Sequence, residues 1–193
     1  MARCYVLASS SPRRRELLAK VGLSFIVDAA DIDETARSPE TPHDLVRRLA
    51  AQKAIVVGTR HPQCLIIGSD TVVAYQGRIF GKPRSMAHAQ DMLRQLSDHR
   101  HQVFTAVAIW DPLWQRGYVQ VDCTAITFNA LSSSEISAYL GTEEPWDKAG
   151  AYAIQGRAGE WIKELTGDVE TVIGLPTRLV KKLLSHWDKE RGV

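Results

Sequence analysis

Hydrophobic positions along the 193-residue chain recur with two periods, which predict a mixture of strands and helices. Apolar runs rich in β-branched residues predict strands at residues 3–8, 24–35, 64–80, 101–111 and 117–128. The second of these segments begins as a strand and leads into an acidic loop. Apolar residues spaced by three and four predict helices at residues 12–21, 41–58, 85–96 and 132–140, and from residue 176 onward.

Local signals support the helix starts and one hairpin. Ser11 and Thr41 are good N-caps, and each is followed by a proline at the first helical position. Ser132 and Glu135 have the spacing of a capping box, and Gln76-Gly77 predicts a tight turn between two strands. Because helices and strands mix without strict β-α-β alternation, the sequence predicts an α/β domain of mixed α+β character around a central mixed β-sheet.

The charge balance and the cysteines argue against several classes of protein. A net charge of +2, from 24 basic and 22 acidic residues, argues against a stable nucleic-acid partner or a membrane, so an anion site must be local. Cys4, Cys64 and Cys123 are far apart and lack C-x-x-C spacing, which argues against a disulfide framework or a zinc knuckle and fits a reducing cytosol. No apolar run predicts a signal peptide or a membrane span.

The sequence "SSSPRRRELL" places three arginines, Arg13 to Arg15, where a helix begins. A helix N-terminus carries a partial positive charge, so cations are disfavoured there. Free backbone N–H groups at a helix start bind anions, and arginine grips phosphate with two hydrogen bonds. The arginines therefore predict a phosphate site, unless they are solvated or paired with Asp33 or Glu34.

Lys53 and Asp70 each stand among apolar residues. Lys53 falls near the centre of the apolar stripe of the helix predicted at 41–58, so it either reaches an anion or snorkels to the surface. Asp70 interrupts the apolar run "LIIGSDTVV", so it is expected to have a structural partner, a metal or a raised pKa. Gly68 beside it predicts the close approach of a ligand or another chain.

The loop "DKAGAYAIQG" contains Gly150, Gly156 and the polar Gln155. Glycine lets backbone approach a ligand, and the glutamine amide offers a donor and an acceptor together, although a tight connection alone would also use these residues. His99 and His101 share a strand face without an evident third metal ligand, and no P-loop or dinucleotide-binding motif is present.

The chain resembles the Maf family of nucleoside triphosphate pyrophosphatases, in motifs that follow the same order over nearly its whole length. The segments that carry the resemblance are "LASSSPRRRELL", "DIDET", "LAAQKA", "IIGSDTVV", "GKP", "VFTAV", "EEPWDKAGAYAIQG" and "GDVETVIGLP". The pairing of Asp70-Thr71 with "DKAGAYAIQG" is similar to the branch that acts on dTTP and UTP, rather than the one that prefers 7-methyl-GTP or CTP. Ala153 departs from the glycine usual in the family.

The resemblance implies a single domain over residues 1–193, with the two-lobed Maf/ITPase-like fold and a cleft between the lobes. It implies a cytoplasmic house-cleaning enzyme, usually a homodimer, that hydrolyses nucleoside triphosphates to the monophosphate and pyrophosphate. It also implies a divalent cation, Mg²⁺ or Mn²⁺, as cofactor.

The resemblance also assigns roles to single residues. It implies that Asp70 is the catalytic proton acceptor. Arg13, Thr71 and Gln155 match positions associated with substrate choice, and Arg14, Glu34, Lys53 and Lys82 match other cleft positions. From their chemistry, we expect phosphate binding from Arg14, Lys53 and Lys82, and metal ligation by Glu34 and Asp70.

Two rival functions remain at this point. A non-enzymatic, nucleotide-binding regulator linked to cell division and septum formation is one, and a phosphatase or kinase acting on another phosphorylated metabolite is the other. The sequence also leaves open whether Asp70 is a direct base or a metal ligand. Both rivals predict that no pyrophosphate is released.

Overall fold

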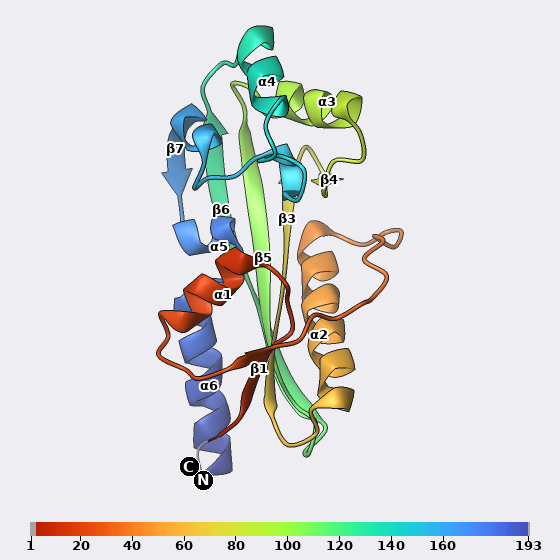
Figure 1. Ribbon diagram of the computed structural model, residues 1–193, viewed down its shortest axis with the longest axis vertical. Coiled ribbons are helices and arrows are strands. Elements are labelled where there is room, and N and C mark those ends of the chain that lie inside the picture. The colour runs from red at the N-terminus through yellow and green to blue at the C-terminus, as the bar shows by residue number, and fades with distance from the viewer. Residues whose placement is uncertain (1–2, 193) are drawn as a thin grey trace. The chain divides into compact units, whose positions relative to one another are not determined.

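The computed structural model describes residues 3–192, which divide into two compact units (Figure 1). Unit 1 comprises residues 3–70, 105–122 and 174–192, and unit 2 comprises residues 71–104 and 123–173. Three of the four boundaries between the units lie inside long strands, β3 (Leu65–Tyr75), β5 (Arg100–Asp111) and β6 (Arg116–Phe128), and the fourth follows Ile173. Each of these strands therefore contributes residues to both units.

The described residues form one seven-stranded sheet in the order β2-β1-β3-β5-β6-β7, with β4 paired to β3 outside that path. β1 (Tyr5–Leu7) pairs in parallel with both β2 (Ile26–Val27) and β3. β3 pairs antiparallel with β4 (Arg78–Phe80), and β6 pairs antiparallel with β7 (Ile162–Thr166). The prediction of a mixed sheet in an α/β fold is confirmed.

In unit 1 the sheet is flanked by α2 (Pro42–Arg60) on one side and by α1 (Pro12–Ala19) and α6 (Thr177–Arg191) on the other (Figure 1). The predicted caps are present: Ser11 Oγ accepts from Arg14 N at 3.4 Å, and Thr41 Oγ1 accepts from Asp44 N at 3.1 Å. The core residues of unit 1 on β1, α2 and β3 include Val6, Leu7, Leu49, Ala50, Val57, Ile66 and Ile67.

At Gly68, α2 approaches β3 closely. A Cβ on Gly68 would overlap the carbonyl oxygen of Ala50 and lie 3.0 Å from the Ala54 Cβ. A close approach was predicted at Gly68, but it is made by the α2 backbone of the same chain and not by a ligand or another chain. It brings the middle of α2 against the segment of β3 that belongs to unit 1.

Unit 2 contains α3 (Met86–Leu96) and α4 (Ser133–Leu140), which pack against each other. The capping box of Ser132 and Glu135 is present at the start of α4. Three short elements were not predicted, because five residues or fewer show no helical period: η1 (Ala149–Ala151), η2 (Arg157–Trp161) and α5 (Val169–Ile173). The core of unit 2 includes Phe80, Met92, Leu93, Leu96, Val103, Ile126, Phe128, Ile136 and Tyr139.

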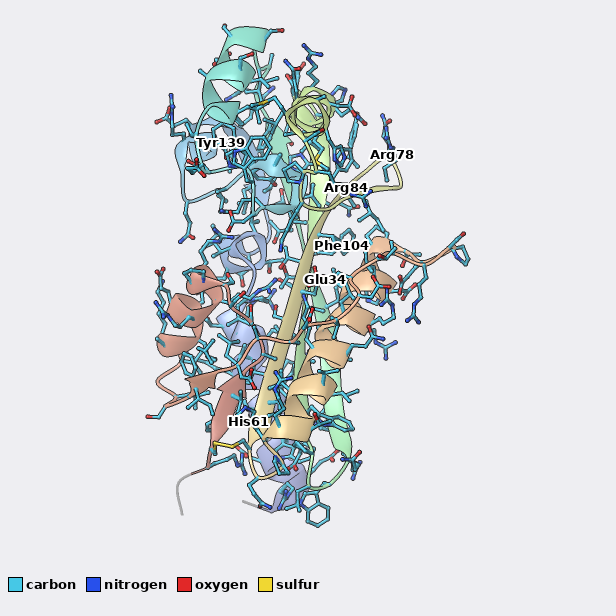
Figure 2. The ribbon with its side chains drawn as sticks, turned by 45° about the vertical axis from the view of Figure 1, so that its right-hand side comes forward. Glu34, His61, Arg78, Arg84, Phe104 and Tyr139 are labelled. Atoms are coloured by element: carbon cyan, nitrogen blue, oxygen red, sulfur yellow. A yellow bond between two sulfur atoms is a disulfide. The ribbon has the colours of Figure 1, made fainter. Side chains whose placement is uncertain are left out.

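Cys4 and Cys64 form a disulfide, so the prediction that argued against a disulfide is wrong. Tyr5 on β1 is in register with Leu65 on β3, so the residues just before them lie side by side, although 60 positions separate them in sequence. Figure 2 draws this bond in yellow, near the labelled His61. Cys123 stays outside the disulfide.

Within the described part of the chain, none of the helices combines the length and the apolar character that crossing a membrane requires.

Candidate functional site

Glu34, Lys53 and Asp70 form a cluster of two carboxylates and one ammonium group in unit 1. Lys53 Nζ on α2 donates to Asp70 Oδ1 on β3 at 2.6 Å, and it lies 2.6 Å from Glu34 Oε1. Lys53 is 7% exposed and Asp70 is 6% exposed, whereas Glu34 is exposed in the loop that precedes α2 (Figure 2). The cluster therefore extends from the core to the surface of unit 1.

The fold explains why an apolar helix face carries Lys53. Leu49, Ala50 and Val57 on the same face are buried, and Gly68 allows this face to approach β3. The Lys53 side chain is therefore aimed at Asp70 instead of snorkelling to the surface. The sequence left open a structural partner for Asp70, and Lys53 is that partner.

Burial and neighbouring charges act on Asp70 in opposite directions. Burial raises the pKa of Asp70 above its ordinary value, because the interior disfavours the ionised carboxylate. The positive charges of Lys53 and Arg14 lower the pKa, and the negative charge of Glu34 raises it by a smaller amount. The result is a raised pKa in a carboxylate that still has cationic partners.

Arg14 forms hydrogen bonds to two other segments of unit 1. Its Nε donates to the Gly174 carbonyl at 2.9 Å, and its Nη1 donates to Ser9 Oγ at 3.2 Å. Ser69 Oγ, one residue before Asp70, donates to the same Gly174 carbonyl at 2.9 Å. Burial lowers the pKa of Arg14, and the charges of Asp70 and Glu34 oppose that shift. One carbonyl thus links the helix start to the strand that carries Asp70.

Ser9, Ser69 and Gly174 are site residues that the sequence analysis missed. Ser9 begins the segment "SSSPRRRELL", in which Ser11 alone of the serines was assigned a role, and Ser69 lies unremarked beside Asp70. Gly174 has a φ of 118°, a conformation that strongly favours glycine. The sequence signal for Gly174 was a glycine shortly before the proline that precedes the last helix. The side chains that donate to its carbonyl, Arg14 and Ser69, are far away in sequence.

The other two arginines differ from Arg14. Arg13 is half-buried, and burial lowers its pKa while Glu16 opposes that shift. Arg15 is exposed. Asp33, which the sequence offered as an arginine partner, accepts from Thr35 N at 2.9 Å. The three arginines therefore have three different environments.

Unit 2 contains Thr71, Lys82 and Gln155. Gly150 N donates to the Gly81 carbonyl at 3.1 Å, which ties the glycine loop to the turn that carries Lys82. Gly150 has a φ of 71°, and a Cβ there would lie 3.0 Å from Val73. Lys82 and Gln155 are exposed, and Thr71 is half-buried. Unit 2 thus brings the "GKP" turn and the "DKAGAYAIQG" loop together.

Metal ligands were expected at Glu34 and Asp70. Within residues 3–192, no group of three or more His, Cys, Asp or Glu side chains is placed to hold a metal ion. Two carboxylates nevertheless fit Mg²⁺, which is typically bound through one or two carboxylates together with substrate phosphates and water. Lys53 joins the two carboxylates through one ammonium group. This donor set therefore fits a hard divalent cation that arrives with a phosphate chain.

The structure thus gathers four of the expected site residues in unit 1, namely Arg14, Glu34, Lys53 and Asp70. Arg13 belongs to the same unit, and Thr71, Lys82 and Gln155 belong to unit 2.

Known proteins resemble this chain over most of its length. A protein of Colwellia psychrerythraea named dTTP/UTP pyrophosphatase is 46% identical over 186 residues, which cover 94% of this chain and 87% of the relative. A Myxococcus xanthus protein of the same name is 48% identical over 171 residues, which cover 89% and 86%. Among solved structures, the Staphylococcus aureus Ham1 protein has a TM-score of 0.50 at 15% identity, covers 95% of this chain and 99% of its own, and shows a likeness of fold.

The family model described as Maf-like protein matches residues 5–187, from β1 to α6. Because that match covers nearly all the described residues, the chain belongs to the Maf-like protein family.

Proposed function

We propose that the chain is a nucleoside triphosphate pyrophosphatase that hydrolyses dTTP and UTP to the monophosphate and pyrophosphate. The activity is the one named for its relatives at 46% and 48% identity. The structural observation that carries the proposal is the buried Asp70 carboxylate with Lys53, Glu34 and Arg14 around it. That set combines a base of raised pKa with cations for a phosphate chain.

Asp70 acts as the general base in this proposal. It accepts a proton from the water that attacks the α-phosphorus, and the bond from that phosphorus to the αβ-bridging oxygen breaks, so pyrophosphate leaves. An ordinary aspartate with a pKa of about 3.9 is a weak base at neutral pH, so a raised pKa favours proton transfer. Burial supplies that shift at Asp70.

The cations act on the triphosphate. Arg14 is oriented by Gly174 and Ser9, so its guanidinium is held before substrate arrives. Lys53 is held by its two carboxylates, and exposed Lys82 belongs to unit 2. We assign phosphate binding to these three side chains, because phosphoryl transfer depends on positioning and on charge stabilisation.

A divalent cation is part of the proposal, with Mg²⁺ or Mn²⁺ as the metal and Glu34 and Asp70 as its protein ligands. An Asp70 that binds the metal would stay ionised and orient the attacking water, which is the alternative to the direct base that a burial-raised pKa favours. When bound, the metal neutralises phosphate charge and polarises phosphoryl oxygens. The exposure of Glu34 suits a ligand that meets the metal together with the nucleotide.

Selection of the base is assigned to Gln155, with Arg13 and Thr71 as further specificity residues. The Gln155 carbonyl accepts from N3–H of uracil or thymine, and its amide donates to O4. Cytosine presents the inverted pattern at these positions, so polar groups would be left unpaired at a penalty of about 1–3 kcal/mol each. Gln155 is exposed, so its amide is open to a ligand.

We further propose that residues 1–193 act as one catalytic domain, as a homodimer in the cytoplasm, without a nucleic-acid partner. The passage of β3, β5 and β6 through both units supports a single domain, because neither unit is a continuous segment. Disulfides are rare in cytosolic proteins, so the Cys4–Cys64 pair would be mostly reduced in that compartment.

The test is pyrophosphate release by the purified chain from dTTP, UTP, CTP, GTP and ATP, with and without added Mg²⁺ or Mn²⁺. We expect pyrophosphate and the monophosphate from dTTP and UTP at rates well above those from CTP, and only with a metal present. Binding without turnover would instead support a regulator, and orthophosphate as the first product would support a phosphatase.

A further inference from the structure

Gln155 lies in a tight turn of unit 2. Gly156 N donates to the Ala153 carbonyl at 3.1 Å, so Gln155 occupies the third position of a four-residue turn. The residues on either side of this turn decide where the exposed Gln155 amide is held. The groups that bind the backbone before and after Gln155 therefore set its position.

Tyr139 and Glu144 together bind the backbone on both sides of this turn. Ala153 N, two residues before Gln155, donates to Tyr139 Oη at 3.2 Å. Arg157 N, two residues after it, donates to Glu144 Oε2 at 3.2 Å. Tyr139 Oη in turn donates to Glu144 Oε1 at 3.0 Å. The Tyr139 hydroxyl accepts one hydrogen bond and donates another, and each oxygen of the Glu144 carboxylate accepts from a different partner.

The pair is itself held by the fold of unit 2. Tyr139, labelled in Figure 2, lies in the last turn of α4 and is 2% exposed. Its ring packs edge-on against Trp161, with ring centroids 4.6 Å apart. Thr142 Oγ1 donates to the Tyr139 carbonyl at 2.7 Å and accepts from Glu144 N at 3.3 Å. Burial raises the pKa of Tyr139, so its hydroxyl keeps its proton and continues to donate.

Gly156 makes room for this arrangement. A Cβ at position 156 would overlap the Glu144 carboxylate, so the glycine that follows Gln155 is needed for the close approach of Glu144. The φ of Gly156 is −111°, which other residues adopt readily, so space and not backbone conformation requires glycine here.

We propose that Tyr139 and Glu144 are positioning residues for base selection, because they clamp the turn that presents Gln155 on both of its sides. The inference rests on the proposed role of Gln155 and adds two residues to it. A side-chain amide pairs with the edge of a base only where the backbone that carries it is held at a fixed distance from that edge, so a mobile turn weakens the selection of uracil over cytosine. The clamp fixes that stretch of backbone.

Two conservative variants of the full chain test the proposal. Tyr139→Phe keeps the ring that packs against Trp161 and removes the hydroxyl that joins Ala153 to Glu144. Glu144→Gln keeps the shape and leaves one acceptor oxygen where the carboxylate has two. The matched control is Glu143→Gln, which neutralises the exposed neighbouring carboxylate outside the clamp. Gln155→Ala is the reference for loss of base selection.

The measurements are kcat and KM for UTP and CTP, and amide hydrogen exchange at Ala153 and Arg157. In both clamp variants, we expect the ratio of kcat/KM for UTP over CTP to fall about tenfold. The fall should come mainly from a higher KM for UTP, with kcat for UTP within about threefold of the parent, since the clamp touches no reacting atom. Exchange of the two amides should become faster, and Glu143→Gln should behave like the parent chain.

The outcomes separate the inference from the function on which it rests. A parent chain without preference for UTP over CTP, or a Gln155→Ala variant that keeps the preference, refutes the role proposed for Gln155 and the clamp with it. If Gln155→Ala loses the preference while Tyr139→Phe and Glu144→Gln keep it, the function stands and the clamp is refuted. Equal losses of kcat for UTP and CTP in the clamp variants, with the ratio of kcat/KM for UTP over CTP preserved, would also refute the clamp. That pattern indicates general damage to the fold.

Discussion

Replacing Lys53 by methionine removes the ammonium group that lies 2.6 Å from Asp70 Oδ1 and 2.6 Å from Glu34 Oε1. Methionine keeps an unbranched apolar side chain on the buried face of α2. The substitution therefore isolates the charge of Lys53 from its packing. It leaves Asp70, at 6% exposure, without its nearest cation.

The magnitude follows from the burial of the two partners. Removing one member of a buried ion pair destabilises a protein by about 3–5 kcal/mol, because the remaining charge is left uncompensated. Arg14 still acts on Asp70 with a positive charge, and Glu34 is exposed to water, so the low end of that range applies. We expect Lys53→Met to lower the free energy of unfolding by about 3 kcal/mol at neutral pH.

The assay is urea unfolding of the parent chain, Lys53→Met, Asp70→Asn and the double variant, in a double-mutant cycle. Asparagine leaves no charge at position 70, so the double variant should be destabilised by less than the sum of the single variants, with a coupling energy of about 2 kcal/mol. Effects that simply add, or a loss below about 1 kcal/mol in Lys53→Met, would refute the buried pair as a coupled unit.

Three further predictions concern other parts of the fold. Cys64→Ser should lower the free energy of unfolding by about 3–4 kcal/mol under oxidising conditions, since the Cys4–Cys64 bond spans 60 positions, and an unchanged urea midpoint would contradict this. Burial lowers the pKa of His101 from 6.5 to about 4. Between these two pH values the unfolded chain binds a proton at His101 and the folded chain does not. The free energy of unfolding should therefore fall by about 3 kcal/mol as the pH drops from 6.5 to about 4. His101→Asn should flatten this slope in urea titrations between pH 7 and 4, and a slope as steep as the parent's would exclude His101 as its source. Gly68→Ala should destabilise the chain by about 1–3 kcal/mol by pushing α2 away from β3, and a melting temperature equal to the parent's would show that the contact with Ala50 relaxes freely.

Features set by neighbouring residues could be predicted from the sequence. The N-caps at Ser11 and Thr41, the capping box of Ser132 with Glu135, and the turn at Gln76 and Gly77 each depend on residues a few positions apart, and the structure contains them. The turn residues Gln76 and Gly77 have φ values of 48° and 75°, as a tight hairpin requires.

Partners brought together by the fold could not be predicted in the same way. Lys53 and Asp70 were each recognised as anomalous in an apolar surrounding, but their pairing depends on the packing of a helix on a strand. The Cys4–Cys64 bond depends on the register of β1 with β3, and the link from Arg14 to Ser69 depends on the carbonyl of Gly174. Each of these contacts needs the arrangement of distant elements, which local periods do not contain.

The measurement that tests the central claim most directly is steady-state pyrophosphate release from UTP by the Asp70→Asn variant, paired with UTP affinity by calorimetry. A general base normally contributes a factor of about 10²–10⁴, so turnover should fall by at least about a hundredfold while UTP binds within about threefold of the parent. Turnover near that of the parent chain, in a variant that folds and binds UTP, would contradict the account.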